Sequence, residues 1–120
     1  MRVIDILPLK LGAVLYPEHE KLKSLIIDEI DSHGSDYEHK KVDAYAKGLE
    51  HLDYYSPLSQ DKYKEFREWI ELQAEIYAKD ILNYDTSDFV LTDSWLNVCD
   101  EGGRQSPHFH INAVICALYY

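Results

Sequence analysis

The sequence predicts an α+β domain in which N-terminal helices pack on one face of a mainly antiparallel sheet. Helical spacing of apolar residues covers residues 17–33 and 57–82, whereas strand-like patterns cover 89–98 and 108–120. Because the helices come first and the strands last, alternating βα units are not expected. A chain of 120 residues is about as long as one domain.

The composition argues against several classes of protein. There are 22 acidic residues against 12 basic ones, a net charge of −10, and an acidic surface repels nucleic-acid phosphates and anionic lipids. No apolar run approaches the ~20 residues that span a bilayer, and Arg2 and Asp5 bring charge too early for a signal peptide. The 2 cysteines are too few for a disulfide framework. We expect a cytoplasmic protein that binds neither nucleic acid nor membranes.

The first half of the chain contains one clear helical pattern. Residues 1–15 are apolar and predict one or two short strands, in which Pro8 argues against a central place in a sheet. Residues 17–33 predict a helix, because Pro17 suits a first helical position and the apolar residues follow helical spacing. Residues 35–55 are polar and weakly patterned, and they predict a loop with a turn of helix at most.

The strongest helical pattern covers residues 57–82. Ser56 suits the N-cap, and proline is tolerated at the first helical position that follows. One apolar stripe lies opposite a charged face, so the helix should bury one side against a sheet. The stripe consists of Tyr63, Phe66, Ile70, Ala74, Tyr77 and Ile81. Its central members, Phe66, Ile70 and Tyr77, are expected to be buried.

The last third of the chain predicts two strands of one sheet. Residues 89–98 and 110–120 are apolar and rich in β-branched and aromatic residues, and Gly102-Gly103 between them predicts a turn. Residues 111–120 have apolar side chains on both faces, as is typical of a strand covered on both sides. We therefore expect this segment to contact another chain or a C-terminal continuation of its own.

Two histidines at the start of the last strand form a candidate metal site. Side chains at i and i+2 share one face of a strand, so His108 and His110 should point the same way. Two neutral imidazoles can share one first-row metal ion. Trp95 and Asn97 share a face of the preceding strand, and the turn would bring them toward the histidines. The alternatives are histidines held by ordinary hydrogen bonds, a core tryptophan and a strand-end asparagine.

Four short motifs resemble those of the 2-oxoglutarate- and Fe(II)-dependent oxygenases of bacteria and their phages. They are Trp95-Leu96-Asn97, Gly102-Gly103, His108-Phe109-His110 and Cys116-Ala117-Leu118-Tyr119-Tyr120. The family usually has Ser-Gly-Val where this chain has Cys116-Ala117-Leu118. The resemblance is closest over residues 89–120 and extends in outline to residue 57.

The resemblance implies a jelly-roll fold, of which this chain would be the N-terminal part. Residues 1–88 would be mainly helical support, and residues 89–120 would supply the first core strands. The distal histidine ligand and the basic residue that binds 2-oxoglutarate would follow Tyr120, so residues 1–120 alone should be inactive. The other histidines, namely His19, His33, His39 and His51, are expected on the solvated surface.

The resemblance also implies roles for individual residues. His108 would be the first Fe(II) ligand, and His110 would stand where most such oxygenases have a carboxylate. Asn97 and Tyr119 would help to position 2-oxoglutarate, and Trp95 would form a wall of the pocket. The substrate would be a small molecule or a protein that is hydroxylated.

Two other functions remain open on the sequence. The chain could be a non-catalytic jelly-roll module that serves in assembly, for instance in a phage particle, because its acidic charge and its uncovered apolar strand suit a subunit. It could also be an α+β binding domain with surface histidines. Metal content separates the oxygenase from the assembly module, which needs no metal.

Overall fold

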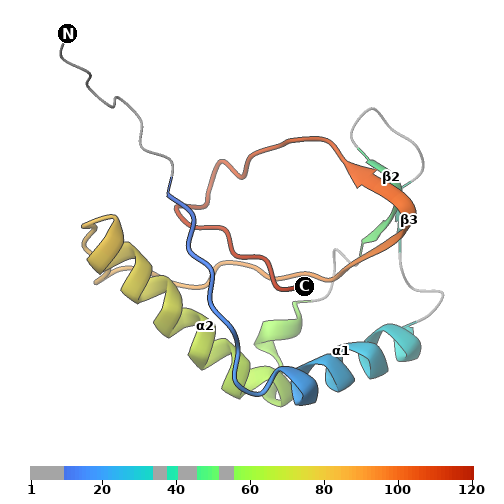
Figure 1. The fold of residues 1–120 in the computed structure, drawn as a ribbon, viewed down its shortest axis with the longest axis horizontal. Helices are drawn as coiled ribbons and strands as arrows, with labels where there is room; N and C mark the ends of the chain where they lie inside the picture. The colour runs from blue at the N-terminus through green and yellow to red at the C-terminus, as the bar shows by residue number, and fades with distance from the viewer. Residues whose placement is uncertain (1–9, 34–37, 41–45, 52–55) are drawn as a thin grey trace, which may run out of the picture.

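The computed structural model describes residues 10–33, 38–40, 46–51 and 56–120 (Figure 1). The elements are, in order, α1 (His19–His33), β1 (Glu38–Lys40), β2 (Ala46–His51), the 3-10 helices η2 (Pro57–Ser59) and η3 (Asp61–Tyr63), α2 (Lys64–Ile76), the π-helix η4 (Tyr77–Ile81) and β3 (Asn97–Gln105). The chain therefore mixes helices and strands, as predicted. In the described residues, no helix has the length and apolar character needed to cross a membrane.

Both predicted helices are confirmed. α1 begins two residues after Pro17 and carries Glu20 in its first turn, where the positive end of the helix dipole favours an acidic residue. The predicted helix 57–82 consists of η2, η3, α2 and η4 in succession. It ends at Asn83, whose φ of 59° is the left-handed conformation that commonly terminates a helix.

The start of the second helical region is capped by a residue from another segment. Ser56, the predicted N-cap, makes no side-chain capping bond. Instead, the backbone N–H of Leu58 donates to Oγ of Ser94 at 3.1 Å, and the two serine hydroxyls are 2.9 Å apart. Ser94 therefore supplies the acceptor that an N-cap residue normally provides, and it ties the irregular segment before β3 to the start of the helices.

The sheet is three-stranded and antiparallel, with the order β1-β2-β3. Lys40 pairs with Leu49, and His51 pairs with Asn97. The loop predicted over residues 35–55 is therefore wrong, because β1 and β2 lie within it. These strands lack alternating apolar residues, and strand formation depends on the neighbouring strand more than on local propensity. They also interrupt the region 1–88 that was expected to be mainly helical support.

The two predicted C-terminal strands differ most from the structure. Residues 89–96 and 106–120 form no strand, and β3 passes through Gly102-Gly103, which was expected to be a turn. Gly102 has a φ of +74°, which glycine adopts without steric penalty. The chain can therefore take this left-handed conformation at Gly102 without ending the strand. A strand that is apolar on both faces needs a paired neighbour and two covering layers, and the described residues supply neither to 110–120.

The hydrophobic core lies between the helices rather than on the sheet. Its buried residues are Leu22, Leu58, Tyr63 and Phe66. Tyr16 and Tyr119 pack against them from the two ends of the described chain. Of the predicted stripe, Phe66 is buried while Ile70 and Tyr77 are half-buried. Among the side chains that the structure describes, none from β3 belongs to this core cluster, so the predicted packing of the helices on a sheet is not seen at β3.

The N-terminal segment 10–16 runs beside the second helical region, as Figure 1 shows. The Tyr77 hydroxyl donates to the carbonyl oxygen of Lys10 at 2.7 Å, and the Lys10 ammonium donates to the carbonyl oxygen of Ile81 at 2.5 Å. A Cβ on Gly12 would lie 3.0 Å from the Tyr77 ring, so the segment passes close to it. Residues 10–15 form no strand, and the rest of the predicted strand 1–15 lies outside the described residues.

Candidate functional site

The two predicted metal ligands lie side by side, although not on a strand. His108 and His110 belong to an irregular segment after β3, just before a turn in which Ala113 N–H donates to the His110 carbonyl at 3.3 Å. Their ring centroids are 5.0 Å apart, with an angle of 79° between the planes. The two rings are neighbours, whereas the strand that was expected to place them on one face is absent.

One ring nitrogen of the pair is held by the backbone. Nδ1 of His108 is 3.1 Å from the carbonyl oxygen of Ser106. A carbonyl can only accept, so Nδ1 carries the proton and donates it. In the neutral imidazole, Nε2 then keeps its lone pair and is the nitrogen that can bind a metal. Both histidines are exposed, so a ligand can reach them from solvent.

Trp95 forms one side of this histidine pair. Its ring centroid is 5.3 Å from that of His110, with the planes inclined by 42°. A large aromatic ring against an imidazole restricts the orientations that the imidazole can adopt. The expected neighbour relation between Trp95 and the histidines is therefore present. Asn97 opens β3 two residues later, and its side chain is exposed.

Tyr119 contacts the helices. Its hydroxyl is 2.8 Å from Nδ1 of His19, and its ring centroid is 5.4 Å from that of Phe66. Burial, followed by the charge of Glu20 and the neighbouring Tyr16, raises the pKa of Tyr119 above its ordinary value. The hydroxyl therefore keeps its proton at neutral pH, and it shares a hydrogen bond with the imidazole. These contacts assign Tyr119 to anchoring the C-terminal segment on α1. His19 lies on the exposed surface, as expected, and it also contacts Tyr119 there.

The described residues provide two candidate metal ligands rather than three. Among the described side chains of residues 10–33 and 56–120, no three His, Cys, Asp or Glu residues come together in a way that could hold a metal ion. A pair of imidazoles suits iron, zinc, copper or nickel. The donor chemistry of His108 and His110 thus fits a first-row metal ion, and a facial triad would need its third ligand from elsewhere.

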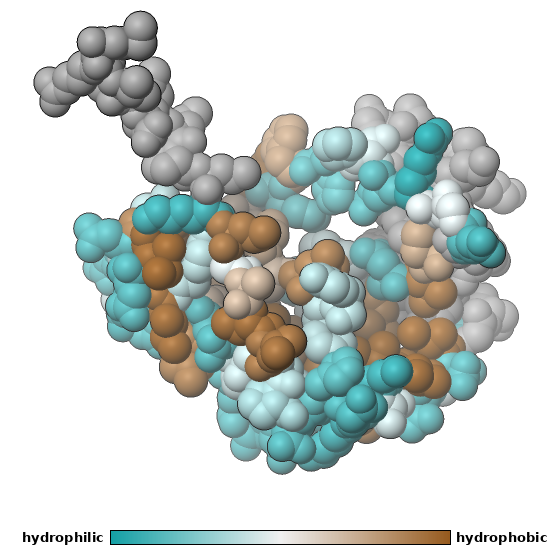
Figure 2. All heavy atoms as spheres, viewed as in Figure 1, coloured by the Kyte–Doolittle hydropathy of each residue, from teal (hydrophilic) through white to brown (hydrophobic). Residues whose placement is uncertain are grey.

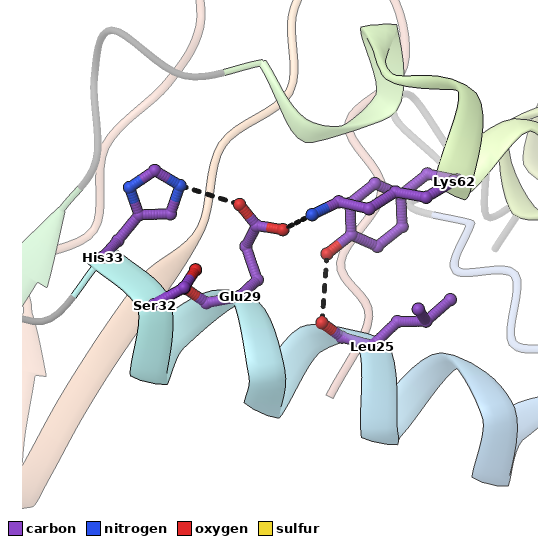
Figure 3. Close-up of polar contacts among 6 residues, drawn as sticks. Leu25, Glu29, Ser32, His33 and Lys62 are labelled. Atoms are coloured by element: carbon purple, nitrogen blue, oxygen red, sulfur yellow. Dashed lines mark hydrogen bonds and ion pairs between the residues drawn. The ribbon is translucent and has the colours of Figure 1, made fainter.

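A second polar cluster joins α1 to η3 and was not predicted (Figure 3). Glu29 is only 3% exposed. One carboxylate oxygen is 2.8 Å from Nε2 of His33, and the other pairs with the ammonium of Lys62. Beside it, the Tyr63 hydroxyl donates to the carbonyl oxygen of Leu25 at 3.4 Å. A buried carboxylate is costly unless it is paired, so this cluster holds α1 against η3.

The sequence contains only a weak signal for this cluster. Glu29 and His33 have the i, i+4 spacing that places two side chains together on a helix. A charged residue on an amphipathic helix is nevertheless usually solvent-exposed, so burial of Glu29 depends on the long-range approach of Lys62. His33 was expected on the solvated surface and instead belongs to the cluster. The side chains of His39 and His51 lie outside the described residues.

Comparisons with known proteins place the chain in no family. No protein-family model matches it, and neither a curated protein nor a solved structure is significantly similar to it.

Proposed function

We propose that this chain forms part of a 2-oxoglutarate- and Fe(II)-dependent oxygenase in which His108 and His110 contribute to the iron site. The observation that carries the proposal is the approach of the two imidazoles, whose centroids are 5.0 Å apart with Trp95 against His110. The motif resemblance supports the same function. When bound, Fe(II) would supply the oxygen activation that hydroxylates the substrate.

The residues of the chain would act by orienting this site. The hydrogen bond from His108 Nδ1 to the Ser106 carbonyl fixes the tautomer and directs Nε2 toward a ligand. Trp95 packs against His110 and would limit access of water from that side. Asn97, at the first position of β3, would help to position 2-oxoglutarate through its amide. Tyr119 would act at a distance, by holding the C-terminal segment against α1.

Further strands would complete this fold as a jelly roll. Ile111, Leu118 and Tyr120 are almost fully exposed, and exposed apolar side chains of this kind usually mark a contact surface. In the proposed protein, another chain or a C-terminal continuation covers residues 111–120. It also supplies the third metal ligand and the basic residue for the far carboxylate of 2-oxoglutarate.

A second candidate function is a non-catalytic assembly module, for example a component of a phage particle. The exposure of the C-terminal apolar residues favours it, since such a surface suits a subunit as well as an enzyme domain. An assembly module would need no metal, whereas the oxygenase depends on one.

Succinate formation from 2-oxoglutarate tests the oxygenase. The natural protein, with any continuation or partner chain, should form succinate only when Fe(II) and oxygen are present. Residues 1–120 alone should form none. His108→Ala and His110→Ala should each abolish turnover, and His39→Ala should preserve it because the proposed site gives His39 no role. A natural protein that binds no iron and forms no succinate would contradict the oxygenase and favour the assembly module.

A further inference from the structure

The histidine pair is open to a second protein molecule. His108 and His110 are both exposed, and in the described residues no third His, Cys, Asp or Glu side chain joins them. A structural zinc site is closed by four ligands in a tetrahedron. Two histidines from one copy of the chain and two from an identical copy would supply these four ligands.

The chemistry around the pair suits an identical copy. Phe109, between the two histidines, and Ile111, just after them, are each 82% exposed. Side chains of this kind gather at interfaces rather than on free surfaces. A two-fold arrangement would bring Phe109 and Ile111 of one copy against the equivalent surface of the other.

The charge distribution favours the same surface. The chain carries a net charge of −10, so two copies repel each other over most of their surface. Residues 105–120 contain no Asp, Glu, Lys or Arg, and they form the longest stretch of the sequence without one of these residues. Approach through this segment keeps like charges apart. A divalent cation at the junction would further offset the repulsion, because neutral imidazoles leave its charge uncompensated.

We infer that two copies of this chain bind one divalent metal ion between them, with His108 and His110 of each copy as its four ligands. This inference rests on the metal-binding role that the proposed function gives to the two histidines. A closed site has no open position for 2-oxoglutarate, so the shared zinc form would be an inactive form of the protein. Tetrahedral ligands about 2.0–2.1 Å from zinc have nitrogens about 3.3 Å apart. Rings with centroids 5.0 Å apart can reach that spacing by small side-chain rotations.

Zinc titration with sedimentation velocity tests the inference. The probe is Zn²⁺ added to metal-free protein, with bound zinc measured in the separated species. We expect the sedimenting mass to double and the dimer to contain one zinc ion per two chains. A chelator should return the protein to the monomer. His108→Ala and His110→Ala should remain monomeric at the same zinc concentration. His39→Ala, which removes an imidazole that the proposed site does not use, should dimerise as the unmodified chain does.

Phe109→Lys provides a variant that keeps both ligands and adds none, because an ammonium group has no lone pair for zinc. The added ammonium groups would lie close together at the junction, so zinc-dependent dimerisation should weaken at least tenfold while circular dichroism stays unchanged. Zinc bound at one ion per chain without dimerisation would overturn the inference. So would His108→Ala and His110→Ala variants that dimerise with zinc as strongly as the unmodified chain. Succinate formation, measured in parallel, separates the two proposals. A zinc dimer together with no succinate from the natural protein, assayed with Fe(II) and with any continuation or partner chain, removes only the oxygenase. Succinate formation by that protein without a zinc dimer removes only the shared site.

Discussion

Tyr119 and His19 are 100 residues apart in sequence and joined by a hydrogen bond of 2.8 Å between the tyrosine hydroxyl and Nδ1 of the imidazole. The bond fastens the C-terminal segment to the first turn of α1. The Tyr119 ring also meets Phe66 edge-on, so the same residue adds to the core between the helices.

The ionisation of Tyr119 should make stability depend on alkaline pH. Burial raises its pKa above the ordinary 10.0, so the folded chain disfavours the phenolate. The resulting stability is fully present below pH 10, the unfolded value, and is lost as the pH rises through the folded pKa. Denaturant unfolding between pH 8 and about pH 11 should show this decline, and Tyr119→Phe should reduce it. At neutral pH the same substitution should cost about 0.5–1.5 kcal/mol through the lost hydrogen bond. A decline of unchanged size in the variant would contradict the assignment.

Lys62 should matter more than an otherwise similar surface lysine. Lys62→Met leaves the buried Glu29 carboxylate with His33 alone, and hydrogen bonds to buried charged groups are worth about 1.5–3 kcal/mol. Lys21→Met is the matched control, because Lys21 pairs with Glu65 at 2.7 Å on the exposed surface. Exposed pairs contribute about 0–1 kcal/mol. Urea unfolding of the two variants checks the order, and an equal or larger loss for Lys21→Met would refute the account of the buried cluster.

Ser94 should contribute more to stability than Ser56. Ser94→Ala removes the acceptor for the Leu58 N–H and should lower the free energy of unfolding by about 0.5–2 kcal/mol, the usual cost of losing a cap. Ser56→Ala removes a hydroxyl that makes no capping bond, so its effect should be smaller. Thermal unfolding of both variants measures the difference. The reverse order would show that the local cap, as the sequence predicts it, is the stronger one.

Phe66 should be among the most sensitive core positions. Its ring is 8% exposed and lies within 5.0–6.1 Å of the rings of Tyr16, Trp69 and Tyr119, measured between centroids. Phe66→Ala should cost about 3–5 kcal/mol, because it removes a large side chain and leaves a cavity. Leu72→Ala is the control on the same helix, since Leu72 is half exposed and should cost far less. Similar losses for both would mean that the core does not centre on Phe66.

Local patterns in the sequence predicted the helices and missed most of the strands. α1 and α2 follow from helical spacing and from prolines at tolerated positions, which act within a few residues. β1 and β2 are short and polar, and they exist because each pairs with a neighbour. Residues 110–120 have strand-like composition but no partner strand among the described residues. Composition alone could not supply one.

The candidate site was predicted in part, for the same reason. His108 and His110 lie side by side without the strand that was expected to place them, and Trp95 lies beside His110. Tyr119 and Glu29 take their roles from segments far away in sequence, namely α1 and η3, and the sequence indicates only the pairing of Glu29 with His33, through their i, i+4 spacing. Figure 2 shows apolar residues over the second helical region and the terminal segments. Their grouping on one face likewise depends on how these segments pack together.

The aromatic core also determines when the chain can finish folding. Phe66 takes ring partners from Tyr16 near one end of the described chain and from Tyr119 near the other. α1 and α2 can meet as soon as both have left the ribosome, whereas Tyr119 reaches Phe66 only after the segment between α2 and Tyr119 has also been made and released. At about 5–20 residues per second, some seconds separate the two events. During that interval Phe66 is open on one side, so the nascent chain would be a substrate for chaperones that bind exposed aromatic residues.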